Sequence, residues 1–419
     1  MRSLCLCFHV HQPVRLKKFR FFDIGKSDYY DDSNNEMIIR RVSKSCYLPS
    51  NKMMLELIKK YEGRFRIAFS ISGTAIDQFR LYAPEVIDSF RDLAATGCVE
   101  FLAETYPHSF VALKNKEKFR SQVEAHSKVI ETLFGKKPTV FRNTDLMYSD
   151  EIGVMVAEMG YKAILSLRPE NILKWRSPNY LYYNKFSPAL KVLLKNHRLS
   201  DDIAVRFSDS DWCGWPMTAK KYVSWLTKAP KEEEIINLMM DYETFGERQK
   251  QESGIYEFMA LLPSVIFTRS DFEFRTPAEV VERYQPVSEI DMPFPISSSN
   301  KEGNLSAWLG NEIQQEAFRK LYELDTMIDQ CKDPDLLMDW QYLQTSDHFS
   351  YMSTKYFGER NTPDNCNPYE NPYEAFMNYM NVLNDFSIRL SHNVEKNMDI
   401  GSSARNWQRS FNYSWENSA

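Results

Sequence analysis

Two acidic side chains stand two residues apart where an apolar run gives way to a turn. Asp241 and Glu243 follow a run that begins near Ile235, and Phe245 and Gly246 close it. Residues i and i+2 of a β-strand point to the same side, so the pattern predicts two carboxylates on one face. Each raises the free-energy cost of ionising the other, as in a candidate acid pair. An equally open interpretation makes one a helix cap and the other a solvated side chain.

Two imidazoles stand at the end of the first apolar run. His9 and His11 share a face by the same period of two, just before Gln12 and Pro13. Imidazoles are good zinc ligands, so a metal pair is one interpretation. No HxxxH, HExxH or clustered Cys/His motif accompanies them, which favours hydrogen bonding to a polar substrate. We therefore expect no metal ion and no other cofactor.

Further polar residues follow other predicted strands. Asp77, Glu104 and Asp145 each fit a helix cap or a solvated loop when taken singly, but together they converge on one end of a barrel. Asp347 and His348 follow a helical run and fit either a loop start or a functional position. The absence of a GxSxG elbow and of a glycine-rich phosphate loop argues against a serine hydrolase and a P-loop nucleotide-binding protein.

Strand patterns alternate with helix patterns over the first three hundred residues. Strand-like runs cover 4–11, 65–73, 98–104, 139–142, 161–165 and 190–194, an apolar segment covers 203–207, and the run ending at Asp241 completes the series. Helices are expected at 50–60, 79–95, 116–134, 149–159 with Ser149 as N-cap, and 219–227, and a long loop at 16–45. This alternation predicts an α/β fold with a parallel sheet, and about seven such units fit a barrel. Its chemistry is expected at the carboxyl ends of the strands.

The pattern changes near Gly303. Helices are expected at 312–331, 334–344 and 372–390 with no strands between them. We therefore expect a catalytic barrel at 1–302, a helical domain at 303–392 packed on it, and a polar C-terminal tail at 393–419.

Composition narrows the class of protein. The 419 residues carry a formal net charge of -5 and no basic tract, which argues against a nucleic-acid partner. Seven scattered cysteines without a CxxC pair favour reduced thiols. No apolar run is long enough to span a bilayer, and the N-terminus lacks the features of a signal peptide, so a cytoplasmic protein with no membrane partner is expected.

Five segments in order resemble glycoside hydrolase family 57, specifically its α-amylase-like members. They are His9–Pro13, Gly73–Asp77, Phe141–Asp145 before Tyr148, Asp241–Gly246, and the later Trp308 with Thr345–His348. The resemblance spans nearly the whole chain. It implies an incomplete (β/α)7 barrel with a C-terminal helical domain. It also implies an enzyme acting on α-1,4-linked glucan or maltooligosaccharide with retention of anomeric configuration and no metal in the chemistry.

The resemblance also assigns roles. Asp241 matches the general acid/base, and Asp145 stands where the family places a nucleophilic glutamate. His9, His11 and Glu243 match residues around the reacting sugar, with Glu243 helping to keep Asp241 protonated. Asp77 stands where many members have glutamate and Arg142 where many have tryptophan. The expected substrate contacts are His9, His11, Asp77, Glu104, Arg142, Glu243, Phe245, Trp308, Asp347 and His348.

Aspartate at position 145 has a physical consequence. Losing one methylene withdraws the carboxylate by about 1.5 Å, one C–C bond length. Retaining enzymes hold their carboxyl groups about 5 to 5.5 Å apart, and inverting enzymes about 6.5 to 9.5 Å apart. Three hypotheses stay open: a hydrolase or transferase of low activity, a catalytically impaired glycan-binding homologue, and a metal-dependent deacetylase-like barrel using His9, His11 and an acid.

Overall fold

The computed structural model describes residues 1–168, 170–297, 303–355 and 367–416, which form two compact units. The first contains Met1–Val14 and Asp32–Ala307, and the second contains Arg15–Asp31 together with described residues from Trp308 onward. The change of pattern near Gly303 therefore falls close to the start of the second unit at Trp308. The membership of residues 15–31 in that unit was not anticipated from the sequence.

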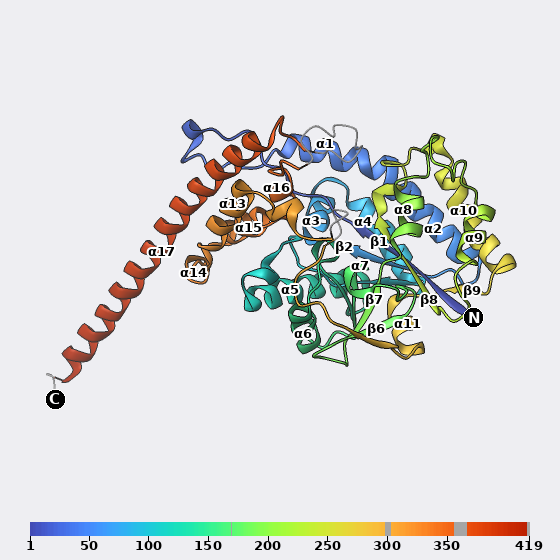
Figure 1. The fold of residues 1–419 in the computed structure, drawn as a ribbon. Coiled ribbons are helices and arrows are strands. Elements are labelled where there is room, and N and C mark those ends of the chain that lie inside the picture. The colour runs from blue at the N-terminus through green and yellow to red at the C-terminus, as the bar shows by residue number, and fades with distance from the viewer. Residues whose placement is uncertain (169, 298–302, 356–366, 417–419) are drawn as a thin grey trace. The chain divides into compact units, whose positions relative to one another are not determined.

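Seven parallel strands form the barrel of the first unit (Figure 1). They pair in the orders β3-β2-β1-β8 and β4-β5-β7, and single parallel bridges from Ala103 to Phe141 and from Lys195 to Asn237 join the two groups. Their bounds are β1 (Arg2–Val10), β2 (Ile67–Ile71), β3 (Val99–Phe101), β4 (Val140–Arg142), β5 (Ala163–Ser166), β7 (Lys191–Leu194) and β8 (Ile235–Asp241). The expectation of a (β/α)7 barrel is confirmed.

Alternation along β1 explains which side chains enter the barrel. Leu4, Leu6, Phe8 and Val10 belong to a cluster shared with the surrounding helices. Cys5 and Cys7 instead pack with residues of the other barrel strands, such as Ala68, Val140 and Leu193. Because side chains alternate along a strand, His9 continues this inner row toward the carboxyl end of β1.

β8 repeats the pattern. Leu238 and Met240 pack outward, whereas Met239 belongs to the inner cluster. Asp241 therefore continues the inner row, and it pairs in register with His9 of β1. The strand ends there, because Tyr242–Thr244 form a short 3₁₀ turn, η5. Glu243 thus leaves the strand period that the sequence analysis applied to it.

The remaining strands lie at the edges of the barrel. β6 (Leu181–Asn184) pairs antiparallel with β7, and β10 (Ser288–Ile290) pairs with β6. β9 (Phe272–Phe274) pairs with the first residues of β1.

Helices of the first unit follow the strands. They are α1 (Asp32–Val42), α2 (Leu48–Lys60), α3 (Gly73–Tyr82), α4 (Pro84–Ala95), α5 (Lys116–Phe134), α6 (Asp150–Glu158), α7 (Glu170–Leu173), α8 (His197–Ala204), α9 (Ala219–Leu226), α10 (Ile255–Arg269) and α11 (Pro277–Arg283). Short turns are η2 (Ser43–Tyr47), η3 (Val111–Leu113), η4 (Thr144–Leu146), η5 and η6 (Gln251–Ser253). Ser149 is the predicted N-cap of α6, since its hydroxyl accepts a hydrogen bond from the Ile152 amide.

Two expected elements were wrong. The loop at 16–45 contains α1, whose buried Asn35, Ile39 and Val42 recur at helical spacing among polar residues that hid the pattern. The apolar segment at 203–207 begins inside α8, where Ile203 is buried. The helical stretches expected through 79–95 belong to two helices, α3 and α4, which are separated because Pro84 disfavours helical geometry at the residue before it.

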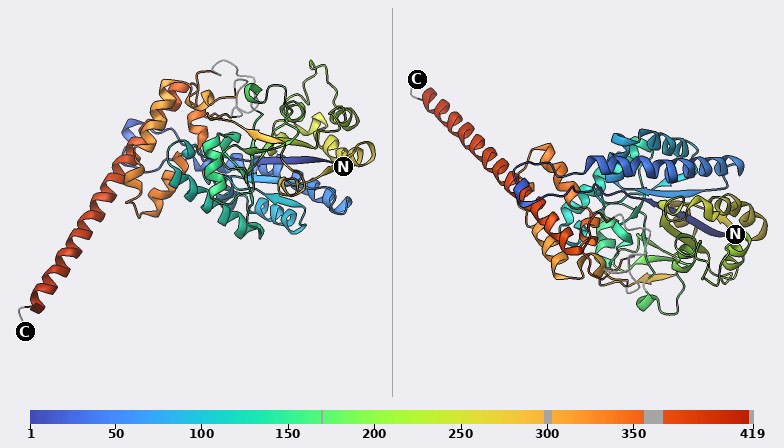
Figure 2. Two further views of the ribbon diagram at one scale, coloured as in Figure 1. Left: turned by 60° about the horizontal axis from the view of Figure 1, so that its bottom comes forward. Right: turned by 90° about the horizontal axis from the view of Figure 1, so that it is seen from above.

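The second unit is helical. Its elements are η1 (Phe21–Asp23), α13 (Glu312–Tyr322), α14 (Asp325–Ile328), α15 (Pro334–Leu343), α16 (Ser346–Ser350) and α17 (Pro372–Glu416), and α12 (Ser306–Leu309) crosses the boundary along the chain. Figure 2 shows α17 as one continuous helix. The expectation of a C-terminal tail from residue 393 was therefore wrong for residues 393–416, which belong to α17. The segment contains no proline after Pro372, so nothing stops the helix although its apolar period fades.

Buried polar contacts tie residues 15–31 to α17 within the second unit. The Phe19 amide donates to Asn378 Oδ1 at 2.6 Å, and the Tyr29 hydroxyl donates to Asp385. Arg389 Nη1 lies 2.9 Å from Asp339 Oδ2 and 3.0 Å from the Tyr29 hydroxyl.

The six described cysteines are free: Cys5, Cys7, Cys46, Cys98, Cys213 and Cys331. Among the described helices, none combines the length and the apolar character that crossing a bilayer requires.

Candidate functional site

Four barrel strands deliver polar side chains to one end of the first unit. His9 is near the end of β1, Glu104 follows β3, Arg142 ends β4 and Asp241 ends β8. Asp145 lies in η4, directly after β4. Because parallel strands present their carboxyl ends at the same edge, these residues converge as the sequence analysis expected.

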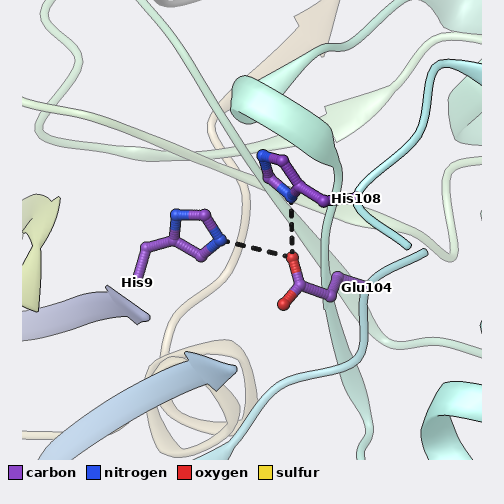
Figure 3. Close-up of side chains that lie close together, drawn as sticks. All are labelled: His9, Glu104 and His108. Atoms are coloured by element: carbon purple, nitrogen blue, oxygen red, sulfur yellow. Dashed lines mark hydrogen bonds and ion pairs between the residues drawn. The ribbon is translucent and has the colours of Figure 1, made fainter. Parts of the chain in front are cut away.

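Glu104 is the buried centre of this site. Its Oε2 lies 3.4 Å from His9 Nε2, 3.3 Å from His108 Nδ1 and 3.8 Å from Arg142 Nη1. Figure 3 shows both imidazoles pointing toward that oxygen. Burial alone would raise the pKa of Glu104, but His9 and His108 hold it well below its usual range. Glu104 is therefore a buried carboxylate.

Each of the two imidazoles also faces a candidate catalytic carboxylate. His9 Nδ1 lies 3.7 Å from Asp241 Oδ1, and His108 Nε2 lies 3.7 Å from Asp145 Oδ2. The groups form a continuous chain in the order Asp145, His108, Glu104, His9, Asp241. The two rings stack with centroids 4.8 Å apart. Asp145 and Asp241 are thus connected through three side chains, of which His9 comes from β1 and Glu104 and His108 follow β3.

The two imidazoles differ in their electrostatics. Burial and the neighbouring His11 lower the pKa of His108 to about 3, so His108 is neutral at neutral pH. Burial and Arg142 also oppose protonation of His9. Glu104 and Asp241 outweigh them, so the pKa of His9 is raised. A neutral imidazole therefore stands beside Asp145, and a more basic one beside Asp241.

Of the two acids Asp241 and Glu243, Asp241 was expected to be the protonated one, but its pKa is the lower of the two. Burial would raise the pKa of Asp241, but His9 and Arg248, whose Nη2 lies 3.0 Å from Asp241 Oδ2, hold it well below its usual range. Burial and Asp241 raise the pKa of Glu243, against a hydrogen bond from Tyr47. As the pH falls, Glu243 therefore takes up a proton before Asp241 does. The sequence-based expectation was the reverse because it did not include Arg248 beside Asp241.

Asp145 has an uncommon backbone conformation. Its φ of 49° and the φ of 54° at Leu146 are both left-handed. Aspartate tolerates this region better than leucine, and such strain costs on the order of 1 kcal/mol at each position. Ser297 holds the segment by donating a hydrogen bond to the Asp145 carbonyl at 3.0 Å. Strained backbone of this kind clusters at functional sites.

Other imidazoles complete the cluster. His11 accepts or donates a hydrogen bond at Ser72 Oγ, 2.8 Å from its Nδ1, and its ring centroid lies 4.1 Å from that of His108. His126 is buried, with Nδ1 accepting from the Glu104 amide and Nε2 donating to the Ile71 carbonyl. Both nitrogens of His126 are therefore engaged by backbone.

Two expected substrate contacts have other surroundings. Asp77 accepts a hydrogen bond from the Tyr106 hydroxyl at 2.8 Å and lies 3.5 Å from Arg80. Phe245 is 1% exposed and packs edge-on against Phe8 in the hydrophobic core. Its role as a substrate contact remains a prediction.

Three expected residues, Trp308, Asp347 and His348, belong to the second unit. Trp308 and His348 are buried there, and His348 Nε2 lies 3.1 Å from the Tyr342 carbonyl. Burial lowers the pKa of His348 to about 4. Their roles as substrate contacts remain predictions.

The sequence analysis missed His108, His126 and Arg248. A signal for His108 was available, since it follows Pro107 only four residues after the candidate Glu104. Arg248 stands just after the acidic segment that ends at Glu247, but loop geometry alone brings it back to Asp241.

Comparisons with known proteins agree with this architecture. A model of glycosyl hydrolase family 57 matches residues 5–293. The chain belongs to glycosyl hydrolase family 57, and this confirms the expected class of a glycoside hydrolase or glucanotransferase. Its sequence is 38% identical over 406 residues to the "Putative alpha-amylase" of Methanocaldococcus jannaschii, covering 93% of this chain and 85% of that protein.

Two solved structures share the fold. One is a GH57 branching enzyme from Thermococcus kodakaraensis, with a TM-score of 0.71, 15% identity, and coverage of 96% of this chain and 92% of that one. The other is the 4-alpha-glucanotransferase from Thermococcus litoralis, with a TM-score of 0.63 and 14% identity over 83% of this chain. This chain spans 56% of the length of that glucanotransferase.

Proposed function

We propose that this protein cleaves or transfers α-1,4-linked glucan chains by a two-carboxylate mechanism. Asp145 attacks the anomeric carbon while Asp241 gives a proton to the leaving oxygen, and Asp241 then takes a proton from the water or hydroxyl that releases the sugar. One observation carries the proposal: Asp145 and Asp241 follow two barrel strands and face imidazoles that share Glu104. The family supports the α-glucan substrate class.

The environments of the two carboxylates suit different tasks. His108 stays neutral beside Asp145, so it does not neutralise the nucleophile with a full positive charge. Asp241 is ionised beside Arg248, whereas a proton donor must carry a proton. The proposal therefore requires the bound sugar to weaken the contacts that His9 and Arg248 make with Asp241, which would raise the pKa of that carboxyl group.

The ion pair between Arg248 and Asp241 also favours a second candidate function. If His9 and Arg248 keep Asp241 ionised, Asp241 cannot donate a proton, and the protein binds α-glucan without turnover. This is the catalytically impaired homologue considered from the shortened Asp145. The two candidates differ in one observable, the conversion of bound oligosaccharide.

Incubation with maltoheptaose, followed by chromatography of shorter and longer oligosaccharides, tests the proposal. Wild type is expected to form products, and Asp145→Asn and Asp241→Asn are expected to lose about a thousandfold or more in rate. Asp88→Asn, on the exposed surface of α4, is the matched control and should equal wild type. Maltoheptaose binding by calorimetry without products from either wild type or Asp145→Glu would overturn the proposal in favour of the binding function.

A further inference from the structure

We propose that His9, Glu104 and His108 form a binding site for a divalent transition-metal ion of the zinc class. The site goes beyond the glucan chemistry proposed above and contradicts the expectation of no metal. Two imidazole nitrogens and one carboxylate form one of the donor sets that zinc uses with an open fourth position. Donor atoms of the three side chains all lie within 4.8 Å of one another.

Two of the three donor separations match those around a tetrahedral ion. Glu104 Oε2 lies 3.4 Å from His9 Nε2 and 3.3 Å from His108 Nδ1. Zinc bonds of about 2.0 to 2.1 Å at tetrahedral angles place neighbouring donors about 3.3 Å apart. Figure 3 shows the two nitrogens approaching the same side of the carboxylate from different segments of the chain.

Burial and hydrogen bonding indicate a missing ligand. His9, Glu104 and His108 are 6%, 0% and 2% exposed. Within the described part of the chain, His9 Nε2 and Glu104 Oε1 are buried without a hydrogen-bond partner. Each such atom costs about 1 to 3 kcal/mol, and a cation bound at Glu104 Oε2 would satisfy His9 Nε2 directly.

The outer nitrogens of the two imidazoles have the surroundings of metal-binding histidines. Such a histidine usually directs its other nitrogen at a carboxylate or a carbonyl oxygen. His9 Nδ1 faces Asp241 and His108 Nε2 faces Asp145, each at 3.7 Å. Both would serve as acceptors for the imidazole protons that remain when the inner nitrogens bind an ion.

His11 provides a matched control inside the same cluster. Its Nδ1 is engaged by Ser72 Oγ at 2.8 Å, and it is not one of the three grouped donors. His11→Gln therefore removes a neighbouring imidazole and leaves the proposed ligands in place.

Metal binding to the purified full chain, stripped with a chelator, tests the inference without any glucan. After equilibrium dialysis against Zn²⁺, elemental analysis is expected to find one ion per chain, and Co²⁺ is expected to give the visible absorption bands of a tetrahedral site. Glu104→Gln and His108→Ala should each weaken zinc binding at least about tenfold, whereas His11→Gln should stay within about twofold of wild type.

Two results would overturn the inference. One is wild type that takes up less than a stoichiometric amount of zinc. The other is a folded Glu104→Gln or His108→Ala variant, as judged by circular dichroism, that binds zinc as wild type does. Glu104→Gln is isosteric, so it keeps the test decisive even if His108→Ala does not fold. Because no oligosaccharide is present, either result leaves the glucan proposal to its own test.

Discussion

Glu100 is a buried acid whose charge destabilises the barrel, so Glu100→Gln should stabilise the protein at neutral and higher pH. The side chain lies on β3 and is 7% exposed. Burial raises its pKa from 4.5 to about 7, against a hydrogen bond from the Ala278 amide to Oε2 at 2.9 Å. Its Oε1 is buried and has no partner among the described residues.

The size and sign of the effect follow from this displacement. A pKa raised from 4.5 to about 7 corresponds to about 3 kcal/mol. Below pH 4.5 both the folded and the unfolded chain hold the proton. Between pH 4.5 and about 7 only the folded chain keeps it, so the unfolding free energy falls as pH rises. Above about pH 7 wild type has lost the whole 3 kcal/mol of unfolding free energy. Glu100→Gln has no titrating group at this position and does not show that loss.

Urea unfolding of wild type and Glu100→Gln at pH 5, 6, 7 and 8 measures the difference. The variant should exceed wild type by less than about 1 kcal/mol at pH 5 and by about 2 to 3 kcal/mol at pH 8. Glu56→Gln, at an exposed position on α2, is the control and should show no such slope. A difference that is independent of pH, or larger at pH 5 than at pH 8, would refute the reasoning.

Three other variants test separate parts of the structure. Gly246→Ala should lower the free energy of unfolding, measured in urea, by about 2 kcal/mol, because φ at Gly246 is +97° and a Cβ there would lie 1.9 Å from the Ser45 carbonyl oxygen. A loss below about 0.5 kcal/mol would contradict this. Arg389→Met should lower the free energy of unfolding by about 3 kcal/mol, because it leaves the buried Asp339 carboxylate with the Tyr30 hydroxyl but without its cation, and an additional Asp339→Asn change should recover much of that loss. Asp145→Glu should raise kcat on maltoheptaose about tenfold or more by extending the carboxylate about 1.5 Å, and an unchanged kcat would contradict the reach argument.

The barrel was predictable from the sequence because its signals are local. The period of two along a strand predicted that His9 and Asp241 present their side chains together at the ends of their runs, and in the structure both lie in register at the ends of the inner faces of β1 and β8. Ser149 predicted the start of α6, because an N-cap hydrogen bond joins residues only three positions apart, here Ser149 and Ile152. The helix α1 was missed because only Asn35, Ile39 and Val42 carry its buried stripe.

The electrostatics of the site were not predictable in this way. Arg248 reaches Asp241 through the geometry of a turn, and it reverses the proton order expected for Asp241 and Glu243. His108 reaches Glu104 from the loop after β3, where the backbone of His108 itself is left-handed with a φ of 58°. Such contacts depend on tertiary structure; residue spacing gave a signal for His108, four residues after Glu104, but none for Arg248.

Trapping of the covalent intermediate tests the central claim most directly. The protein would be incubated with a fluorinated maltosyl fluoride that forms glycosyl-enzyme faster than it releases it, then digested and analysed by mass spectrometry. We expect one fluorinated maltosyl group attached to the peptide that contains Asp145, and none in Asp145→Asn. A label on another carboxylate such as Asp241, or the absence of any label on wild type, would contradict it.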